Sequence, residues 1–547
     1  MQEPTDENKT NPSECEFTCD SGKVSNDEAS RVSAFSGSQS IGKGSLAIMF
    51  SQVLFLGFNF LLRYFLAQNV TPADVDIYHL VVSVLIMSFQ RIIHYGLPVA
   101  VSKYLSEDPA YLGYFMKKGL KLQIYFSLIL FVISVAITPL VVVAVNNKSI
   151  VMPYILGCIS IPFFAIYNIR LCILNGLRRF YQEAFTMTAY GLFRLVLVVI
   201  MVYLFADHAL DGAIFSNTFA AILGLAIAWM LTRVSFGYRE DKHMLKDIIN
   251  FVGPNILSIL LLHILMNIDM FIINRYFATN LNPAGYYSQA SFLALLPFVL
   301  FNALYATIFP NIVHEISRGA VEKAREIVMF STRVIAIVQI PICMIIWGSA
   351  GEIIRLFNPP EYLAASLSLS VLVVSISLFT LFMNLGVITV AGGHPRKFTS
   401  SFLFLLPLGV ILNLLIVPFC ATRGVHWQYG SEKLMWHDIG GSEVLISVVW
   451  TLTGAAIASG LTAFAGCLYL GLHVQKHFKG IFDFKTALRA FLAAIPAYIF
   501  VYFVHMSGIM ILVELMIAFL IYAVAIVAAG EFKRDELKTI FGRFKKN

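Results

Sequence analysis

Long runs of apolar residues recur at short intervals between residues 45 and 529 of the sequence. A helix needs about 20 mostly apolar residues to cross a bilayer, and fourteen segments approach or exceed that length. Only 13% of the residues are charged and 58% are hydrophobic, whereas soluble domains carry about 25% charged residues. We therefore predict an all-α polytopic membrane protein with about fourteen transmembrane helices. These helices are expected at 45–67, 77–102, 119–145, 150–176, 182–205, 211–234, 248–275, 286–310, 330–350, 366–391, 398–420, 443–472, 487–504 and 509–529.

Lysine and arginine residues alternate between the two sides of the predicted membrane. With the N-terminus inside, the inner segments hold 30 basic residues and the outer loops hold 5. Cytoplasmic loops carry the basic excess in membrane proteins, so both termini are predicted to be cytoplasmic and the protein is expected in the cytoplasmic (inner) membrane. Residues 1–43 are polar, show no signal-peptide pattern and are predicted to be a disordered cytoplasmic tail. Residues 531–547 form a basic cytoplasmic tail, either an interfacial helix or a solvated stop-transfer segment.

Two stretches resemble each other at a separation of six predicted helices. Arg63-Tyr64-Phe65 precedes Pro98, and Arg275-Tyr276-Phe277 precedes Pro310, with 35 residues from arginine to proline in both cases. Because six is an even number, the two copies would insert in the same orientation. Internal repeats of this kind build many transporters, with the substrate site between the copies. Chance similarity between apolar segments is the alternative explanation.

The repeat predicts two pseudo-symmetric six-helix lobes plus two C-terminal helices. The N-lobe covers 44–235 with helices 1–6, the C-lobe covers 236–475 with helices 7–12, and helices 13–14 lie in 476–530. An outer loop at 421–442 contains two histidines and several aromatic residues. That loop either stacks on sugar rings or forms an aromatic belt at the membrane interface.

No catalytic constellation is visible in the sequence. It contains no phosphate-cradling glycine loop, no nucleophile motif and no carboxylate cluster, so a pump with its own ATPase is excluded within this chain. The seven cysteines form no framework, and Cys15-x-x-x-Cys19 alone is a weak metal signal. The net charge of +7 follows from the basic inner loops and does not indicate nucleic-acid binding. We predict a protein that is not an enzyme, with no cofactor.

Charged side chains at membrane depth are rare and usually face a cavity or a partner. Arg91 and Arg194 lie too deep to reach an interface, whereas Arg63 and Arg170 either reach an interface or line the cavity. A guanidinium group matches phosphate oxygens with its planar fork of donors and stays charged at every working pH. The charges at membrane depth are Arg63, Arg91, Arg170, Arg194, Asp269 and Glu514.

Four arginines against one obvious internal counter-ion indicate an anionic substrate. The predicted substrate-binding residues are Arg63, Arg91, Arg194, Asp269 and Arg275. In the structural alternative, Asp269 pairs with one of the helix arginines and holds the lobes together. The histidines at membrane depth predict no metal site, because no two of them lie at positions i and i+4 with an acid.

Prolines and small residues give two further expectations. Pro98 and Pro310 are candidates for bends that shape the cleft between the lobes. Gly454 and Ala458 form a small face that favours close helix packing.

Several motifs occur in an order and spacing that point to one family. They are Arg63-Tyr64-Phe65-Leu66-Ala67, Tyr95-Gly96-Leu97-Pro98-Val99-Ala100-Val101-Ser102-Lys103, Asn175-Gly176-Leu177-Arg178-Arg179-Phe180, Gly393-His394-Pro395-Arg396-Lys397 and Leu452-Thr453-Gly454-Ala455-Ala456-Ile457-Ala458-Ser459. Together they resemble the polysaccharide biosynthesis (oligosaccharide flippase) family of the multidrug/oligosaccharidyl-lipid/polysaccharide (MOP) exporter superfamily. The resemblance covers nearly all of 45–530.

This chain departs from the family pattern in two places. The motif Asn413-Leu414-Leu415-Ile416-Val417-Pro418 also resembles the family, which usually joins it to the motif at Leu452 by a few residues, whereas 33 residues intervene here at 419–451. The lipid II flippase branch carries cavity arginines in the first half of helix 1, where this chain has Gln52 and Phe58. Arg91 does resemble an arginine that this branch places in helix 2.

The resemblance implies a flippase that moves a polyprenyl-diphosphate-linked oligosaccharide from the cytoplasmic to the outer leaflet by alternating access. The substrate would be a cell-envelope or polysaccharide precursor, either a lipid II-like one, which is not favoured, or another lipid-linked glycan. The diphosphate would lie against Arg91, Arg194 and Arg63. The implied partners are the lipid-linked glycan and membrane lipids. Glycan polymerase or assembly proteins are candidates for further partners. One alternative is an ion-coupled multidrug or small-solute antiporter of the same superfamily, which predicts acids in the cleft. Another is a polytopic glycan-modifying enzyme that uses the histidines of the loop 421–442.

Overall fold

The computed structural model describes residues 41–107, 109–145, 147–232, 244–276, 283–428, 443–480, 484–506, 508 and 510–531. Throughout these ranges the regular structure is helical, with no strand. Helices are what an apolar chain forms in lipid, because each helix satisfies its own backbone hydrogen bonds. Twelve helices in the described ranges are long and apolar enough to cross a membrane. The prediction of a polytopic all-α membrane protein is confirmed, and the count of fourteen helices is approximate.

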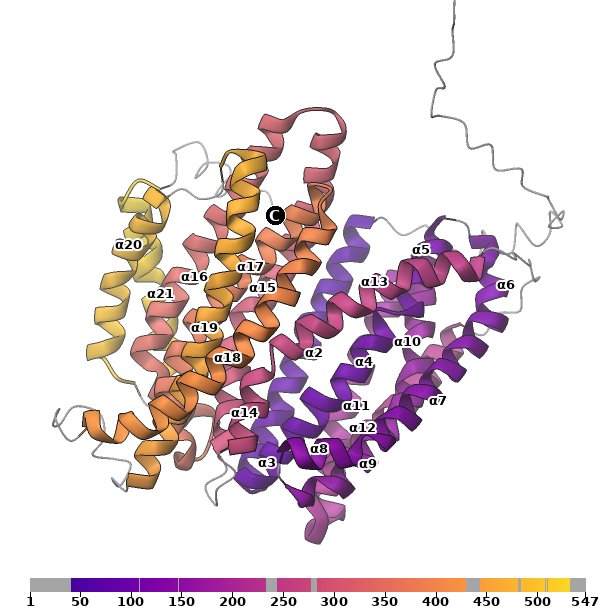
Figure 1. Cartoon of the computed structure of the whole chain (residues 1–547), viewed down its shortest axis with the longest axis horizontal. Helices are drawn as coiled ribbons and strands as arrows, with labels where there is room; N and C mark the ends of the chain where they lie inside the picture. Colours follow the sequence, from indigo (N-terminus) through magenta and orange to yellow (C-terminus); the bar gives the residue numbers. More distant parts are fainter. Residues whose placement is uncertain are drawn as a thin grey trace, which may run out of the picture.

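The first half of the chain forms a bundle that we name the N-terminal bundle (Figure 1). In it, α11 packs against α2 and α12, and α10 packs against α5, α7 and α12. Its elements are α2 (Ile41–Asn69), α3 (Pro72–Tyr78), η1 (His79–Ile86), α4 (Met87–His94), α5 (Leu97–Glu107), η2 (Pro109–Tyr111), α6 (Leu112–Tyr114), η3 (Phe115–Gly119), α7 (Leu120–Ala136), α8 (Thr138–Val145), η4 (Lys148–Ile150), α9 (Val151–Cys158), α10 (Ser160–Gly176), α11 (Phe180–Leu204), η5 (Ala206–His208) and α12 (Ala209–Leu231).

The second half forms the C-terminal bundle, which comprises α14 to α21. In it, α19 packs against α17 and α18, while α16 contacts α15, α17 and α20. The elements of this half are α13 (Met244–Leu265), α14 (Ile268–Tyr276), α15 (Pro283–Ser317), α16 (Val321–Phe357), η6 (Pro360–Ala365), α17 (Ser366–Ala391), α18 (Pro395–Gln428), α19 (Glu443–Phe478), α20 (Phe484–Phe503) and α21 (Met510–Ala528).

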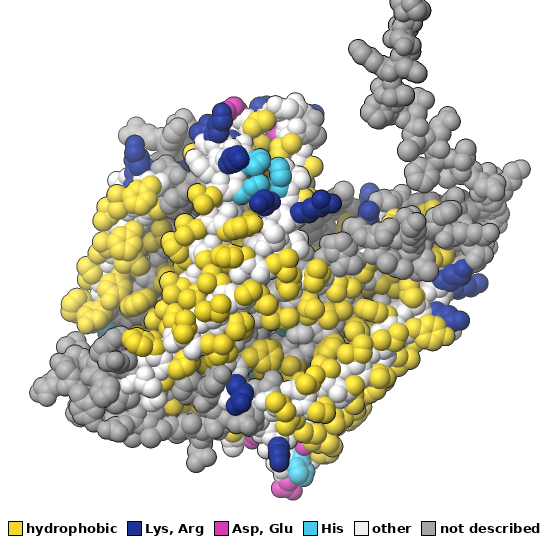
Figure 2. Space-filling view, in the orientation of Figure 1, with side chains coloured by type: hydrophobic (Ala, Val, Ile, Leu, Met, Phe, Trp, Pro, Cys, Tyr) yellow, Lys and Arg dark blue, Asp and Glu magenta, His cyan; other side chains and the backbone are white. Residues whose placement is uncertain are grey.

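Hydrophobic side chains cover the middle of the molecular face drawn in Figure 2, and lysine and arginine side chains gather toward its two ends. This distribution suits a bilayer, whose hydrocarbon core contacts the apolar belt while the charged groups stay in the headgroup region. We call the end that bears the α17–α18 connection the inner end, because it is predicted to be cytoplasmic, and the opposite end the outer end.

Several helix boundaries differ from the predicted ones. Helix α2 already begins at Ile41, and α18 continues to Gln428, inside the predicted outer loop 421–442. The predicted helix 7 is broken at Met266 and Asn267 into α13 and α14. The predicted division between helices 13 and 14 is confirmed by α20 and α21. Three segments lie outside the described residues: residues 1–40 of the predicted tail 1–43, residues 429–442 of the predicted outer loop, and residues 532–547 of the predicted tail 531–547.

Small residues bring the helices of the C-terminal bundle close together. A Cβ atom added at Gly454 of α19 would lie 2.9 Å from the Cβ of Cys420 in α18. A Cβ atom added at Gly460 would lie 2.6 Å from the Oγ of Ser375 in α17. Both separations are shorter than non-bonded atoms tolerate, so the close packing of α19 against α18 and α17 requires glycine at these two positions. The predicted small face at Gly454 is confirmed as a packing surface.

The two matched prolines have different surroundings. Pro98 follows a break in the helix at Tyr95 and Gly96 and starts α5 as its second residue, where a proline costs no helical hydrogen bond. Pro310 lies inside α15, which is assigned as helix without a break from Pro283 to Ser317. The helix breaks next to Pro98 and continues through Pro310, and the bend at Pro310 stays a prediction. In the second copy, the break falls in the preceding helix, between α13 and α14.

The two bundles share one hydrophobic cluster near the outer end. It contains Leu66 and Tyr78 of the N-terminal bundle together with Ile273, Ala290 and Ile354 of the C-terminal bundle. Contacts of α3 with α15 and of α8 with α14 join the bundles there.

At the inner end the hydrophobic clusters are separate. Leu97, Val101 and Ile173 belong to one cluster, and Ile312 and Phe402 belong to another. Helix α13 links the bundles, because it contacts α4 and α5 on one side and α18 on the other; Figure 1 shows it crossing between them. The bundles are thus packed together most continuously near the outer end.

A buried carboxylate fastens the C-terminal helices to the bundle. The side chain of Glu531, which follows α21, is only 3% exposed, and it accepts hydrogen bonds from the Nε of Arg333 at 2.9 Å and the Nη1 of Arg489 at 3.3 Å. The hydroxyl of Thr486 donates to the same carboxylate at 2.7 Å. The group therefore joins α16, α20 and the end of α21.

The double variant Arg333→Ala/Arg489→Ala is expected to lower the free energy of unfolding by about 3 kcal/mol, because it leaves a buried carboxylate without a cation. Arg489→Ala alone is expected to cost about 0.5 kcal/mol, since Arg489 is 47% exposed and surface ion pairs contribute little. Unfolding of the purified protein in mixed detergent–SDS micelles measures both values. Equal losses in the single and double variants would contradict this account.

Candidate functional site

Arg63 lies on α2 at the boundary between the two bundles. Its Nη2 donates to the Nδ1 of His79 at 2.8 Å and to the Oγ of Ser83 at 3.0 Å. An arginine donates only, so the Nδ1 of His79 is the acceptor. The guanidinium also stacks over the ring of Phe292 in α15, with its central carbon 4.4 Å from the ring centroid. Arg63 therefore contacts both bundles.

The local fold of η1 presents both polar partners of Arg63. Residues His79–Ile86 form a π-helix, an arrangement that is frequent at functional sites. His79 and Ser83 are four residues apart in this segment, so they face the same side and reach the same guanidinium.

Arg194 lies on α11 within the N-terminal bundle. Its Nε donates to the Oδ1 of Asn217 in α12 at 2.9 Å, and its Nη1 donates to the Oδ1 of Asn59 in α2 at 2.9 Å. Asn59 precedes Arg63 by four residues, one helical turn, so both lie on the same face of α2. The two arginines are thereby directed to one region.

We call Arg63 and Arg194 the arginine pair. They lie near enough to interact electrostatically with each other, and Tyr78 is close enough to interact with both. Their hydrogen-bond partners given above are an imidazole, a hydroxyl and two amides, all without negative charge. Among the described residues, neither arginine forms an ion pair with a carboxylate. The pair thus concentrates positive charge at membrane depth.

Arg91 lies apart from this pair, on α4. It follows Ser83 by eight residues, which corresponds to about 12 Å along a helix. Its Nη2 contacts the sulfur of Met87 at 3.9 Å, and its Nε is buried with no hydrogen-bond partner among the described residues. It also interacts electrostatically with His263 of α13. Arg91 is therefore a partly buried cation with unused donor capacity, beside the helix that links the bundles.

Asp269 belongs entirely to the C-terminal bundle. Its Oδ2 accepts from the hydroxyl of Tyr287 at 2.5 Å and of Ser459 at 3.1 Å, and its Oδ1 accepts from the backbone N–H of Met270 at 2.8 Å. It lines a cavity of about 80 Å³ together with Ser291 and other residues of that bundle. The alternative in which Asp269 pairs with a helix arginine is wrong for this structure, because three donors of its own bundle already hold the carboxylate.

The other predicted charges fall in different environments. Arg275 ends α14 with an exposed side chain. Arg170 is buried, donates to the Oγ1 of Thr232 and stacks on Trp229 at 3.8 Å. Glu514 is buried and accepts from the backbone N–H of Met506 at 2.7 Å. The fold thus brings Arg63 and Arg194 together and leaves Arg91, Asp269 and Arg275 apart from them.

Sequence reasoning missed the neutral partners of the arginine pair and one further acid. The sequence does contain a signal for these partners, because the four-residue spacings from Asn59 to Arg63 and from His79 to Ser83 place polar side chains on one helix face. Asp76 of α3 is buried, and its Oδ1 has no hydrogen-bond partner among the described residues. It escaped notice because it lies close to the predicted start of a transmembrane helix, where acids are ordinary.

A second cavity, of about 490 Å³, lies between α16, α17 and α20. Apolar side chains form most of its lining, with Gln339 and Ser377 among the polar ones. It contains none of the arginines discussed above.

Comparisons with known proteins agree with the architecture. The chain is similar to the lipid II flippase MurJ in its inward closed conformation, at 16% identity and a TM-score of 0.65, over 88% of this chain and 97% of that chain. It is also similar to a multidrug resistance MATE family transporter of the MOP superfamily in an inward-facing conformation, at 16% identity and a TM-score of 0.57, over 78% and 96% of the two chains. At these identities the likeness shows the fold.

A MOP superfamily transporter from Pyrococcus furiosus has the same fold, at 14% identity and a TM-score of 0.53, over 83% of this chain and 97% of that one. No curated protein sequence matches the chain. The sequence profile of the polysaccharide biosynthesis protein family matches residues 41–314, half of the chain. This multi-pass membrane protein, with the fold of the MOP superfamily, therefore belongs to the polysaccharide biosynthesis protein family.

Proposed function

We propose that this protein is a flippase that moves a polyprenyl-diphosphate-linked oligosaccharide from the cytoplasmic to the outer leaflet. The observation that carries the proposal is the arginine pair, two neighbouring guanidinium groups held by uncharged partners, of which Arg63 lies at the bundle boundary. Both arginines are partly buried. Cations at membrane depth that lack an anion among their neighbours favour binding of an anionic ligand, because the ligand supplies the missing charge in a medium of low dielectric.

A diphosphate suits this pair better than a carboxylate does. It offers several oxygens to two separate donor forks, and bidentate bonds from arginine to phosphate are both strong and directional. In this proposal the lipid tail remains in the bilayer, and the saccharide passes between the two bundles. Asp269 is left out of this phosphate site, because its negative charge would repel the diphosphate.

Arg91 is assigned a separate step. Its Nε has no hydrogen-bond partner in the part of the chain that the structure describes. Arg91 lies closer to the inner end than Ser83 does, beside His263 of the linking helix α13. We assign to it the first contact with a diphosphate that enters from the cytoplasmic side. Arg275 and Asp269 are left out of this step, because Arg275 is exposed in the last turn of α14 and Asp269 is held by three donors of its own bundle.

Alternating access follows from the unequal packing of the two ends. A shared hydrophobic cluster closes the outer end, whereas the inner halves contribute to separate clusters. If the termini are cytoplasmic as predicted, this arrangement corresponds to an inward-facing state of the proposed transporter. Release to the outer leaflet would require the outer cluster to separate as the bundles rock. Glycan polymerase or assembly proteins would then receive the lipid-linked product.

Wild-type protein in liposomes is expected to translocate a fluorescent polyprenyl-diphosphate sugar. It is not expected to translocate a lipid with the same chain and sugar but no phosphate, because the arginine pair would have no anion to bind. Reduction of the fluorophore by external dithionite reports the fraction in the outer leaflet. Faster equilibration of ethidium or another organic cation than of the diphosphate lipid would favour the antiporter. Covalent change of the sugar would favour the enzyme.

A further inference from the structure

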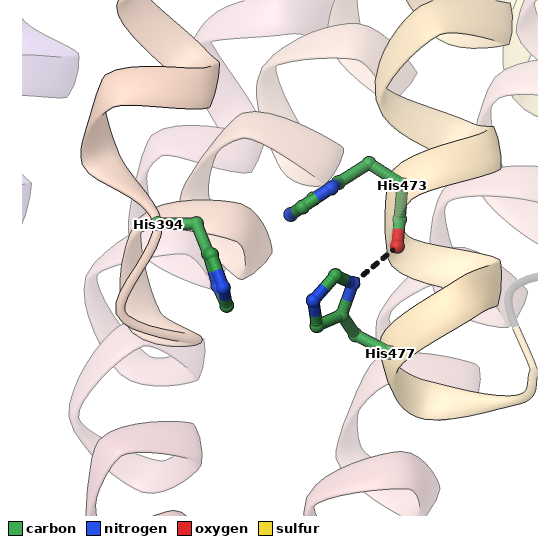
Figure 3. A group of neighbouring side chains, drawn as sticks. All are labelled: His394, His473 and His477. Carbon is green, nitrogen blue, oxygen red and sulfur yellow. Dashed lines mark hydrogen bonds between the residues drawn. The ribbon is translucent and has the colours of Figure 1, made fainter.

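Three histidines, one from a connection and two from the end of a helix, meet at the inner end of the C-terminal bundle (Figure 3). His473 and His477 lie at positions i and i+4 near the end of α19, so their side chains share one face of the helix. His394 lies in the connection between α17 and α18 and points toward them. Sequence reasoning that considered only histidines at membrane depth missed this group. None of the three has a place in the proposed translocation path.

The turn that carries His394 is built to hold it in place. Gly393 has φ = +84°, a conformation that glycine adopts without strain. The backbone N–H of His394 donates to the carbonyl of Thr389 at 3.1 Å, which closes the end of α17. Pro395 begins α18 at once. The residue is therefore fixed between two helices on a short, constrained connection.

The ring positions allow the three side chains to bind one ion. One ligand nitrogen from each histidine lies within 4.8 Å of the other two. The ring centroids are 4.3 Å apart for His473 and His477, 4.5 Å for His394 and His477, and 5.0 Å for His394 and His473. Nitrogens around a tetrahedral zinc ion, at bonds of about 2.0–2.1 Å, lie about 3.4 Å apart. Small side-chain rotations would close the remaining gap.

His477 has the hydrogen bond and the tautomer that are typical of a metal-binding histidine. The Nδ1 of His477 lies 2.9 Å from the backbone carbonyl of His473. A carbonyl only accepts, so Nδ1 carries the proton and donates, and Nε2 keeps its lone pair. Zinc ligands commonly donate their second ring nitrogen to a carbonyl in this way, which fixes the ring orientation.

We propose that His394, His473 and His477 form a binding site for a divalent transition-metal cation, with zinc as the ion expected. Imidazole ligands suit Zn²⁺, Cu²⁺ and Ni²⁺, whereas Mg²⁺ and Ca²⁺ require oxygen ligands. Three protein ligands leave a fourth position open. Because none of the three histidines is buried, solvent can supply the fourth ligand. Lys397 and Lys476 interact electrostatically with His473, and their charge favours an anion such as hydroxide or chloride there.

The bound ion would fasten the α17–α18 turn to the inner end of α19. These segments belong to one bundle, so the site would stiffen that bundle without joining it to the other. Metal binding is measured without any lipid substrate. A failure to bind metal would therefore not contradict the proposed translocation, and a failure to translocate lipid would not contradict the metal site.

The test uses the full-length protein, with its purification tag removed and metals stripped by a chelator, titrated with Co²⁺ and then with Zn²⁺. Wild type is expected to bind one equivalent of Co²⁺, with a visible absorption band that Zn²⁺ abolishes. The variant His473→Gln/His477→Gln is expected to bind at least tenfold more weakly. Zn²⁺ is expected to raise the thermal unfolding temperature of wild type by several degrees and that of the variant by none.

Matched controls separate this site from the other potential ligands of the chain. Cys15→Ser/Cys19→Ser and His426→Gln/His437→Gln are expected to bind as wild type does. His394→Gln, which changes only the turn, tests the site if the double variant on α19 does not fold. Absence of a stoichiometric Co²⁺ band in wild type would overturn the proposal. Undiminished binding in both His394→Gln and a folded His473→Gln/His477→Gln variant would do the same.

Discussion

The variant Arg63→Ala/Arg194→Ala is expected to translocate the fluorescent polyprenyl-diphosphate sugar at less than about one hundredth of the wild-type rate. Hydrogen bonds to charged groups contribute about 1.5–3 kcal/mol each, and 1.4 kcal/mol corresponds to a factor of ten. Loss of one such interaction from each arginine therefore predicts a decrease of about 10²-fold to 10⁴-fold. Dithionite assays in liposomes measure the rate, and equilibrium binding of the same lipid measures the affinity.

The conservative variant Arg63→Lys/Arg194→Lys tests the geometry of the site. It keeps both charges but loses the planar donor forks, so an intermediate rate is expected. Arg170→Lys is the matched control, because Arg170 is a buried arginine of the same bundle whose partners, Thr232 and Trp229, lie in or beside α12. The control is expected to transport at nearly the wild-type rate. Wild-type transport by the double alanine variant would remove the arginine pair from the mechanism.

A cross-link between Phe60→Cys and Phe357→Cys is expected to stop translocation almost completely. In the wild-type structure, the two phenylalanine rings pack edge to face with centroids 4.6 Å apart. They join α2 of the N-terminal bundle to the end of α16 in the C-terminal bundle. A short thiol-reactive cross-linker there would hold the bundles together and prevent their separation. The experiment requires a background in which the seven native cysteines are replaced.

A second cysteine pair provides the control for this experiment. Phe55 and Tyr190 stack with centroids 6.1 Å apart, and both belong to the N-terminal bundle, on α2 and α11. Cross-linking Phe55→Cys to Tyr190→Cys is expected to leave translocation within about twofold of the uncross-linked protein. Reductive cleavage of a disulfide-containing cross-linker should restore transport in the Phe60→Cys/Phe357→Cys variant. Unimpaired transport by the cross-linked Phe60→Cys/Phe357→Cys variant would show that the bundles do not separate there.

The sequence by itself determined the class of fold and the chemistry available at membrane depth. Apolar segment length is a local property, and a membrane-spanning segment satisfies its own backbone hydrogen bonds, so the helices followed from short stretches of chain. The split between α20 and α21 was predicted from segment length, and the packing role of Gly454 was predicted from the small residues around it. Arg63 and Arg194 were recognised because charges in apolar segments are costly and therefore informative.

Only the tertiary structure decided which of these groups meet. The partners of Arg194 come from α2 and α12, and Phe292, which stacks on Arg63, comes from the other bundle. Asp269 turned instead toward Tyr287 and Ser459. Such contacts join residues far apart in the chain and depend on how several helices pack at once, which hydropathy and charge counting do not specify. His394 and His473 meet for the same reason, through a glycine turn and the neighbouring helix.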